Sequence, residues 1–357
     1  MNATTRVIIT LALLALAPAA RPNSTLSPDL ALVDRHIVPG YQRLAGATAR
    51  LAERSGRFCA ATNEAELQAL RADYHAAADA WQSIQHVRIG PVELYTRRYR
   101  FEMWPDRKNV LSRHLLALLA TRDEAALQTE RFARASVAVQ GFPALERLLY
   151  PGDEVLSEFG PDEAGRYRCR VLNAITANLH GMASEIVVEW TSGEDSHRGL
   201  VAAAAKGNRF YADGRDVSGK LLGSLNTALL FMIEDKLGKP LGESIESAAP
   251  KRTESWRSQR SARDLILNLD AVAELYRARF APHLDAALNG RMELEIERAS
   301  SRLRAVEMPL FKAVSDAGQR VYLDDARGAL GAMRELVAGP IATALDLAMG
   351  FNARDGD

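Results

Sequence analysis

The sequence predicts an all-α protein built from long amphipathic helices. Ala, Leu, Arg and Glu dominate, apolar residues recur at three- and four-residue steps, and β-branched alternation is scarce. The 357 residues are 47% hydrophobic and 25% charged, an ordinary globular composition, and the length suggests two domains or one large duplicated one. The 45 basic and 45 acidic residues balance, so the composition does not indicate a nucleic-acid partner.

The N-terminus has the features of a secretory signal peptide, predicted at residues 1–20. Arg6 provides a positive charge, residues 7–16 form a short apolar core, and Ala17-Pro18-Ala19 offers a small-residue cleavage site. The apolar run is short for a membrane span, and an uncleaved anchor is the alternative. We therefore expect an exported mature chain without a transmembrane span.

The chain has two cysteines, Cys59 and Cys169. In an oxidising compartment one pair permits one disulfide. Such a bond would close a long loop and stabilise the fold by about 3–5 kcal/mol. Two separate thiols are the alternative.

Local signals predict the helices in chain order. Ser27-Pro28-Asp29 opens a helix to about residue 55, and Asn63 with Glu66 forms a capping box for a second helix, which Gly90-Pro91 ends. Further helices are expected at 109–120, 123–140, 143–150 and 163–190, from near 195, from 214 to about 236, and at 260–282, 291–316 and 319–349. Residues 207–214 and 248–259 are expected to be irregular.

Two basic residues occur where an apolar stripe reaches a helix end. Trp81 and Arg88 are seven residues apart on the second predicted helix and therefore share its buried face. Lys236 follows the stripe of Leu225 and Leu229 in the same way. A buried charge needs a partner. The alternative is that each base interacts with its helix C-terminus and extends to water.

Residues 95–109 interleave basic and aromatic side chains and contain Trp104-Pro105-Asp106-Arg107. Such mixtures can bind single-stranded nucleic acid. Here the run is short and the total charge is balanced. A loop packed over the mouth of a helix bundle is the favoured interpretation.

Residues 137–151 form an apolar run that contains Gly141, Pro143 and a single acid, Glu146. Because Pro143 lacks a backbone donor, the helix should start or kink near Gly141. Glu146 then has an aromatic residue one turn before it and another one turn after it. Such a carboxylate lies either at the rim of the core or in a site.

Motifs of common catalytic centres are missing. The sequence contains no H-E-x-x-H, G-x-S-x-G or C-x-x-C, and it lacks the two Glu-x-x-His motifs that build a di-iron bundle. His75 and Asp79 are one turn apart and could share a cation, although a surface contact is the commoner outcome. No catalytic residue, metal ligand or cofactor is therefore assigned from these motifs.

Five spaced segments together resemble the imelysin-like family of exported bacterial proteins. They are Ala80-Trp81 with Arg88-Ile89-Gly90-Pro91, F-E-M-W-P-D-R at 101–107, G-F-P-A-L-E at 141–146, K-L-G-K-P-L-G at 236–242 and W-R-S-Q-R-S at 256–261. The resemblance implies two four-helix-bundle-like domains, residues 27–192 and 193–350, packed around a cleft. It also implies a location in the periplasm or at the outer envelope, and association with iron uptake.

The same family is grouped with metallopeptidases through a G-x-H-x-x-E motif. In this chain the motif consists of Gly141, Pro143 and Glu146, so the neutral nitrogen ligand is replaced. We therefore expect a non-catalytic binding or accessory protein, with iron or an iron chelate as its ligand. A metallopeptidase is one alternative, and a helical scaffold that docks an envelope partner protein is the other.

The expected cleft residues come from all five segments. They are Trp81, Arg88, Trp104, Arg107, Glu146, Lys236, Arg257 and Ser258. Arg88 or Arg107 is expected to pair with Glu146 or to hold an anionic ligand, because the guanidinium fork matches a carboxylate. An iron chelate, an anionic ligand or a segment of an envelope iron-uptake protein suits such a site, whereas a bare metal ion would be repelled. Convergence of these side chains at one pocket would distinguish a binding protein from a scaffold.

Overall fold

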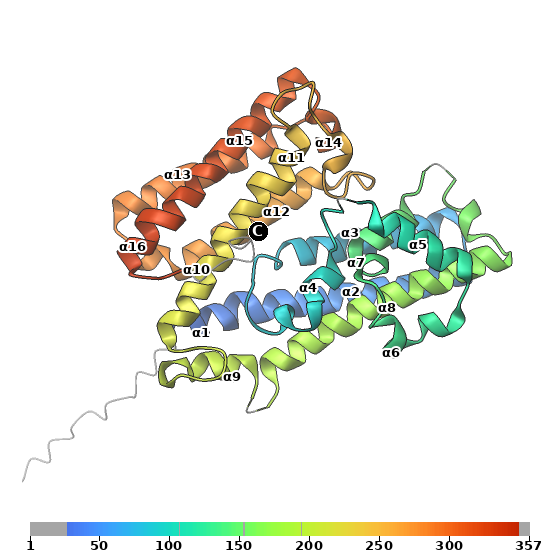
Figure 1. The fold of residues 1–357 in the computed structure, drawn as a ribbon, viewed down its shortest axis with the longest axis horizontal. Coiled ribbons are helices and arrows are strands. Elements are labelled where there is room, and N and C mark those ends of the chain that lie inside the picture. The colour runs from blue at the N-terminus through green and yellow to red at the C-terminus, as the bar shows by residue number, and fades with distance from the viewer. Residues whose placement is uncertain (1–26, 107, 153, 194, 350–357) are drawn as a thin grey trace, which may run out of the picture.

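The computed structural model describes residues 27–106, 108–152, 154–193 and 195–349. This part of the chain consists of helices, turns and loops and contains no strand, which confirms the all-α prediction (Figure 1). None of its helices is both long and apolar enough to cross a membrane. The predicted signal peptide lies outside the described residues.

The first part of the chain packs around three long helices. The helix α1 (Pro28–Leu32) continues through a π-helical turn, η1 (Val33–Ile37), into α2 (Val38–Ala60), which ends later than predicted. Helix α2 packs along both α3 (Glu64–Gln82) and α8 (Glu163–Thr191). These are the blue and light-green helices in the lower half of Figure 1.

The predicted start of α3 is confirmed and its predicted end is wrong. The Asn63 side chain accepts a hydrogen bond from the backbone N–H of Glu66 at 3.0 Å. The helix stops at Gln82, and residues 83–87 form tight turns, in which Val87 donates to the carbonyl of Ile84 at 3.0 Å. The helical face predicted to carry both Trp81 and Arg88 therefore does not extend to Arg88.

A layer of short helices follows α3. It contains η2 (Gly90–Thr96), α4 (Arg97–Phe101), α5 (Val110–Thr121), η3 (Glu124–Leu127), α6 (Thr129–Phe132), η4 (Val137–Val139), α7 (Gly141–Leu149) and η5 (Ser157–Phe159). The single helix predicted at 123–140 is wrong. The side chains of Asp123 and Ser136 each cap a new short turn, and the Gln140 amide donates to the carbonyl of Ala135 at 2.8 Å.

The second part of the chain contains a second group of long helices. Its elements are α9 (His197–Ala202), η6 (Ala204–Lys206), α10 (Gly214–Phe231), η7 (Met232–Gly238), α11 (Lys239–Leu241), η8 (Pro250–Arg252), α12 (Ser261–Arg279), η9 (Ala281–His283), α13 (Ala286–Arg304), α14 (Leu310–Ala313), α15 (Ala317–Leu336), η10 (Val337–Ile341) and α16 (Ala342–Leu345). Helix α13 starts before the predicted residue 291, because Asp285 caps it, and it ends well before residue 316. The last predicted helix is interrupted by the π-helical turn η10, which contains Pro340.

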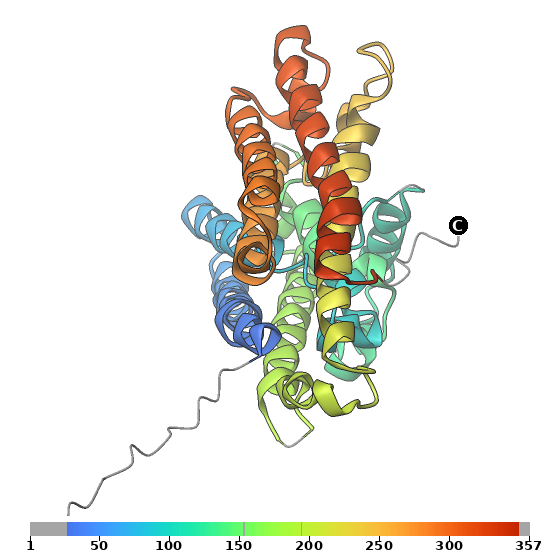
Figure 2. The same cartoon turned by 90° about the vertical axis from the view of Figure 1, so that its left-hand side faces the viewer.

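The two groups lie toward opposite ends of the molecule. In Figures 1 and 2, the orange and red helices α13 and α15 occupy one end and the helices α2 and α8 the other. Helix α12 contacts both α1 and α3, and α9 contacts both α8 and α1. The predicted division into residues 27–192 and 193–350 stays a prediction.

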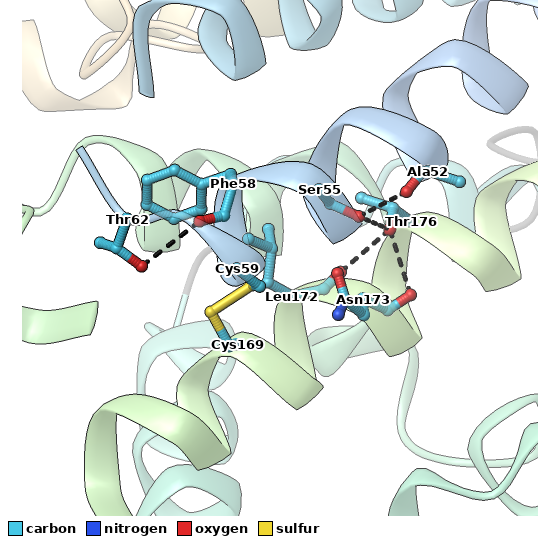
Figure 3. Close-up of a disulfide and its surroundings, with 9 residues drawn as sticks. All are labelled: Ala52, Ser55, Phe58, Cys59, Thr62, Cys169, Leu172, Asn173 and Thr176. Carbon is cyan, nitrogen blue, oxygen red and sulfur yellow. Dashed lines mark hydrogen bonds between the residues drawn. A yellow bond between two sulfur atoms is a disulfide. The ribbon is translucent and has the colours of Figure 1, made fainter. Parts of the chain in front are cut away.

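A disulfide joins Cys59 near the end of α2 to Cys169 in α8 (Figure 3). The predicted disulfide, and not a pair of separate thiols, is therefore what the structure contains. The two Cα atoms are 5.6 Å apart and 110 residues apart in sequence. One turn along α2 and two turns along α8 from this bond, the hydroxyls of Ser55 and Thr176 share a buried hydrogen bond of 2.8 Å. Closing a loop of this length restricts the unfolded chain, which stabilises the fold by about 4–5 kcal/mol.

Candidate binding cleft

A cleft of about 530 Å³ lies where the two groups of helices meet. The described residues that line it come from four parts of the chain: 103–106 with 109 and 111, 143 with 146–147, 235 with 239, and 251–253 with 255–257. Its volume is in the range of pockets that hold small molecules. The first two parts belong to the first half of the chain and the last two to the second half.

Helix α7 presents the glutamate of the family motif to this cleft. Gly141 has φ +77°, and a Cβ at this position would lie 2.2 Å from the carbonyl oxygen of Phe101. Only glycine fits this left-handed position against another backbone. Pro143 lies in the first turn, where a missing N–H costs little, so α7 begins at Gly141. Pro143 and Glu146 are three residues apart and both line the cleft.

The carboxylate of Glu146 is bound by Ser258. Glu146 is 6% exposed, and its Oε1 accepts hydrogen bonds from the Ser258 backbone N–H at 2.9 Å and from the Ser258 hydroxyl at 2.7 Å. Burial raises the pKa of Glu146, and the two Ser258 donors together with Arg257 oppose that rise. Arg88 or Arg107 is expected from the sequence to pair with Glu146 or to hold an anionic ligand. In the part of the chain that the structure describes, the hydrogen-bond partner of Glu146 is instead Ser258, 112 residues away.

Positive side chains outnumber negative ones around the cleft. Among the described residues, five basic ones line it, Arg147, Lys239, Lys251, Arg252 and Arg257, and three acidic ones, Asp106, Glu146 and Asp235. Each acid is engaged inside the protein. Asp106 accepts from the backbone N–H groups of Val110 and Leu111 at the start of α5, at 2.8 and 3.0 Å, and Asp235 pairs with Lys239.

Arg257 and Trp256 form a stacked pair in the cleft wall. The guanidinium carbon of Arg257 lies 4.1 Å from the centre of the Trp256 ring. Burial, and then the neighbouring Arg147, lower the pKa of Arg257 to about 10. Two guanidinium groups held together in this way favour a bound anion, because an anion reduces their repulsion.

A buried polar network lies directly behind the cleft wall. Lys236, 2% exposed, donates to Glu254 at 2.5 Å, to Asn268 at 2.6 Å and to Gln82 at 2.9 Å. The interpretation of Lys236 as a base that extends to water is therefore wrong. Trp81 Nε1 donates to the Glu102 carboxylate at 2.6 Å in the same region. Burial, and then the charge of Glu254, raise the pKa of Glu102 well above its usual value.

The predicted site residues converge in part. Trp104, Glu146 and Arg257 line the cleft, and Ser258 holds Glu146 from behind. Trp81 and Lys236 lie in the buried network, and Asp235, the neighbour of Lys236, lines the cleft wall. Arg107 lies outside the described residues.

Arg88 is not among the residues that line the cleft. It lies in the turn after α3, where its backbone N–H donates to the hydroxyl of Ser224 in α10 at 3.2 Å. The prediction failed because it extended α3 to Gly90, which put Arg88 on the same face as Trp81.

Sequence reasoning missed several lining residues. They are Asp106, Arg147, Lys239, Lys251, Arg252 and Trp256. Asp106, Lys239 and Trp256 lie inside the recognised motifs, and Arg147 follows one directly, so the motifs contained a signal for these four. Lys251 and Arg252 lie in the polar connection 248–259, and nothing local distinguishes them from solvated bases.

The residues present do not fit a directly bound metal ion. The motif's histidine position is occupied by Pro143, and the Glu146 carboxylate is engaged by two donors and faces arginines. In the described ranges no three His, Cys, Asp or Glu side chains are grouped so that they could hold a metal.

Comparisons with known proteins identify the family. The family model for imelysin, a peptidase M75 family, matches residues 37–337. The chain belongs to the imelysin family. The predicted resemblance is thus confirmed, and Gly141, Pro143 and Glu146 lie inside the matched range.

Solved structures of similar fold include an imelysin-like protein from Psychrobacter arcticum. It has a TM-score of 0.75 and 18% identity, with 92% of this chain and 98% of that chain covered. An iron-regulated protein A precursor from Parabacteroides distasonis has a TM-score of 0.74 and 14% identity, with 92% and 97% covered. At these identities the likeness shows the fold alone.

A sequence relative is iron-regulated protein A from Synechococcus elongatus. It is 24% identical over 247 residues, which are 69% of this chain and 62% of that protein. The chain thus spans less than two thirds of the length of that relative.

Proposed function

We propose that this imelysin-family protein is an exported, non-catalytic binding or accessory protein of bacterial iron acquisition, and that its cleft holds an anionic iron chelate. The observation that carries the proposal is the charge of the cleft. Of the residues that the structure describes, five basic and three acidic ones line it. Asp235 pairs with Lys239, which is one of the five, and Asp106 and Glu146 accept hydrogen bonds within the protein, so a positive excess remains. Such a lining attracts an anion and repels a bare cation.

The link to iron rests on similarity. A sequence relative and a protein of the same fold are both named iron-regulated protein A. The proposal that this chain is exported rests on the signal-peptide features of residues 1–20, and the word precursor in the name of the Parabacteroides distasonis protein is in keeping with it. We place the mature protein in the periplasm or at the outer envelope, where it would pass its ligand to envelope iron-uptake proteins.

Binding by the purified full-length protein tests this function. Native mass spectrometry of protein isolated from the periplasm should detect a bound anionic chelate, and calorimetry should show binding of ferric citrate or a ferric catecholate. Arg257→Gln should weaken binding at least ten-fold, because it removes a half-buried cation from the wall. Arg50→Gln, at an exposed position on α2, is the matched control and should have no effect.

Two results would overturn the proposal. One is failure of every ferric chelate to bind to the folded protein. The other is a stoichiometric metal together with chelator-sensitive cleavage of casein, which would restore the metallopeptidase alternative.

A further inference from the structure

We propose that the cleft selects iron chelates whose donor groups are aromatic diolates, that is catecholates, over chelates made only of aliphatic carboxylates. The inference rests on the proposed function and names the ligand class for the same cleft. Its basis is the combination of two fixed indole rings with Arg257, which forms no ion pair with any described residue.

Two of the four tryptophans line the cleft. Trp104 packs edge-on against Phe231, with ring centroids 5.5 Å apart and an interplanar angle of 87°. Trp256 packs against Phe311, with centroids 6.2 Å apart. These contacts hold both indoles in place while part of each ring stays exposed to the cleft. Trp81, by contrast, is buried in the core.

Arg257 supplies a cation that no ion pair within the described residues neutralises, and the acid whose charge acts on it, Glu146, is already bound by Ser258. Arg257 stacks on Trp256 and makes no hydrogen bond or ion pair with any residue that the structure describes. The fully buried Arg97, by contrast, binds Glu185 and Glu189. Arg257 is therefore an arginine on an aromatic platform, beside a second arginine, facing an open cavity.

A ferric catecholate complex matches these features. It carries net negative charge and exposes flat, electron-rich rings, which stack on guanidinium and indole groups. An aliphatic hydroxycarboxylate chelate offers the same sign of charge but no ring. It would engage the cations and leave the indoles without a planar partner.

The motif glutamate is a positioning residue in this arrangement. Ser255 and Gln259 both have positive φ, +49° and +58°, so the turn between them is a strained conformation that needs support. Glu146 supplies that support through its two hydrogen bonds to Ser258. The same turn carries Trp256 and Arg257, so α7 fixes the recognition pair from across the cleft.

The experiment compares two probes, ferric 2,3-dihydroxybenzoate and ferric citrate, by calorimetry and tryptophan fluorescence quenching on the full-length protein. We expect the catecholate Kd to be at least ten-fold lower. Trp104→Leu should reduce that ratio toward one with little change in the citrate Kd, whereas Trp104→Phe, which keeps a ring, should preserve most of it. Iron-free 2,3-dihydroxybenzoate controls for binding of the ligand alone.

The positioning role of Glu146 is tested by the same ratio of the citrate Kd to the catecholate Kd. Glu146→Gln keeps an oxygen acceptor for Ser258 and should retain the catecholate preference, while Glu146→Leu should lose it. Circular dichroism verifies that each variant is folded, and the Trp104 pair gives an answer if Glu146→Leu does not fold.

The outcomes separate the two proposals. If both chelates bind with equal affinity, or citrate binds more tightly, the aromatic selectivity is wrong and the proposed function stands. If neither chelate binds to the folded wild-type protein, both proposals fail. If Trp104→Leu lowers both affinities equally, the indole has no selective role and the further inference is overturned.

Discussion

At the scale of single residues, the motif glutamate shows how a side chain is reused when its partner changes. With Pro143 at the histidine position, the cleft side of α7 presents no nitrogen ligand. Glu146 instead accepts two hydrogen bonds from Ser258, and its neighbours are cations. Its identity was predictable from the sequence, but its partner was not, because 112 residues separate the two and only the tertiary fold brings them together.

Ser258→Ala should lower the free energy of unfolding by about 1–2 kcal/mol, because a charged, buried carboxylate loses one of its two donors. The loss should be larger at pH 8 than at pH 5. Without the Ser258 hydroxyl the pKa of Glu146 rises further, so the loss of stability is greatest at a pH where the Glu146 carboxyl must be ionised. Urea unfolding at both pH values measures this. Ser301→Ala, on the exposed side of α13, is the control and should change stability by less than about 0.5 kcal/mol. An equal loss at the two pH values would contradict the assignment.

A second residue-scale prediction concerns His197, which is 5% exposed and hydrogen-bonded to the Tyr211 hydroxyl at 2.6 Å. Burial, and then the charge of Arg209, lower the pKa of His197 to about 4. An unfolded histidine titrates near 6.5. As the pH falls from 6.5 to 4, the unfolded chain takes up a proton that the folded protein does not. The free energy of unfolding therefore falls as the pH is lowered from 6.5 to 4, and this pKa difference accounts for about 3 kcal/mol of the fall.

Replacing the side chain isolates that contribution. His197→Gln removes the titrating group, so the free energy of unfolding of the variant should fall less steeply between pH 7 and pH 4 than that of the wild type. Other titrating groups are common to both proteins and cancel in the difference. Identical slopes in urea titrations across this range would show that His197 does not titrate as described.

At the scale of elements, local chemistry predicted where helices start better than where they stop. Asn63 caps α3 and Gly141 opens α7, because a side-chain acceptor and a left-handed backbone are properties of the sequence itself. The end of α3 was missed because Gly90-Pro91 is a strong stop signal eight residues too late. The predicted helix at 123–140 failed because Asp123, Ser136 and Gln140 bond to backbone groups and stabilise turns instead.

Gly141→Ala should destabilise the protein by more than about 3 kcal/mol, because its Cβ would meet the Phe101 carbonyl in addition to the cost of a positive φ. The matched control is Gly193→Ala. Gly193 has a similar φ of +83° and open space around its Cβ position, so only backbone strain of about 1 kcal/mol is expected. Thermal and urea unfolding compare the two. Equal losses would mean that the close approach of α7 to α4 is not what requires glycine.

At the scale of the whole molecule, long-range polar contacts connect the two groups of helices. Arg260 at the start of α12 bonds Asp79 of α3 at 2.6 Å, and Asp29 of α1 pairs with Arg279 of α12. Lys236 joins Gln82 to Glu254. The sequence predicted the helices that carry these residues from their apolar periodicity. It could not predict the pairings, since they depend on how distant helices pack.

The buried Lys236 network couples the stability of the two groups of helices. Lys236→Met leaves the Glu254 carboxylate, 3% exposed, without its cation, and should cost about 3–5 kcal/mol. Lys236→Met combined with Glu254→Gln removes both charges, so most of that stability should return, with a coupling energy of at least about 2 kcal/mol in the double-mutant cycle.

The control is Lys220→Met, which breaks an exposed pair with Asp216 and should cost less than about 1 kcal/mol. Because Gln82 lies in the first group and Glu254 in the second, the loss should appear in one cooperative transition. Tryptophan fluorescence and circular dichroism should then give the same urea midpoint for Lys236→Met. Two separated transitions would instead show that the halves fold independently and that the network stabilises only its own side.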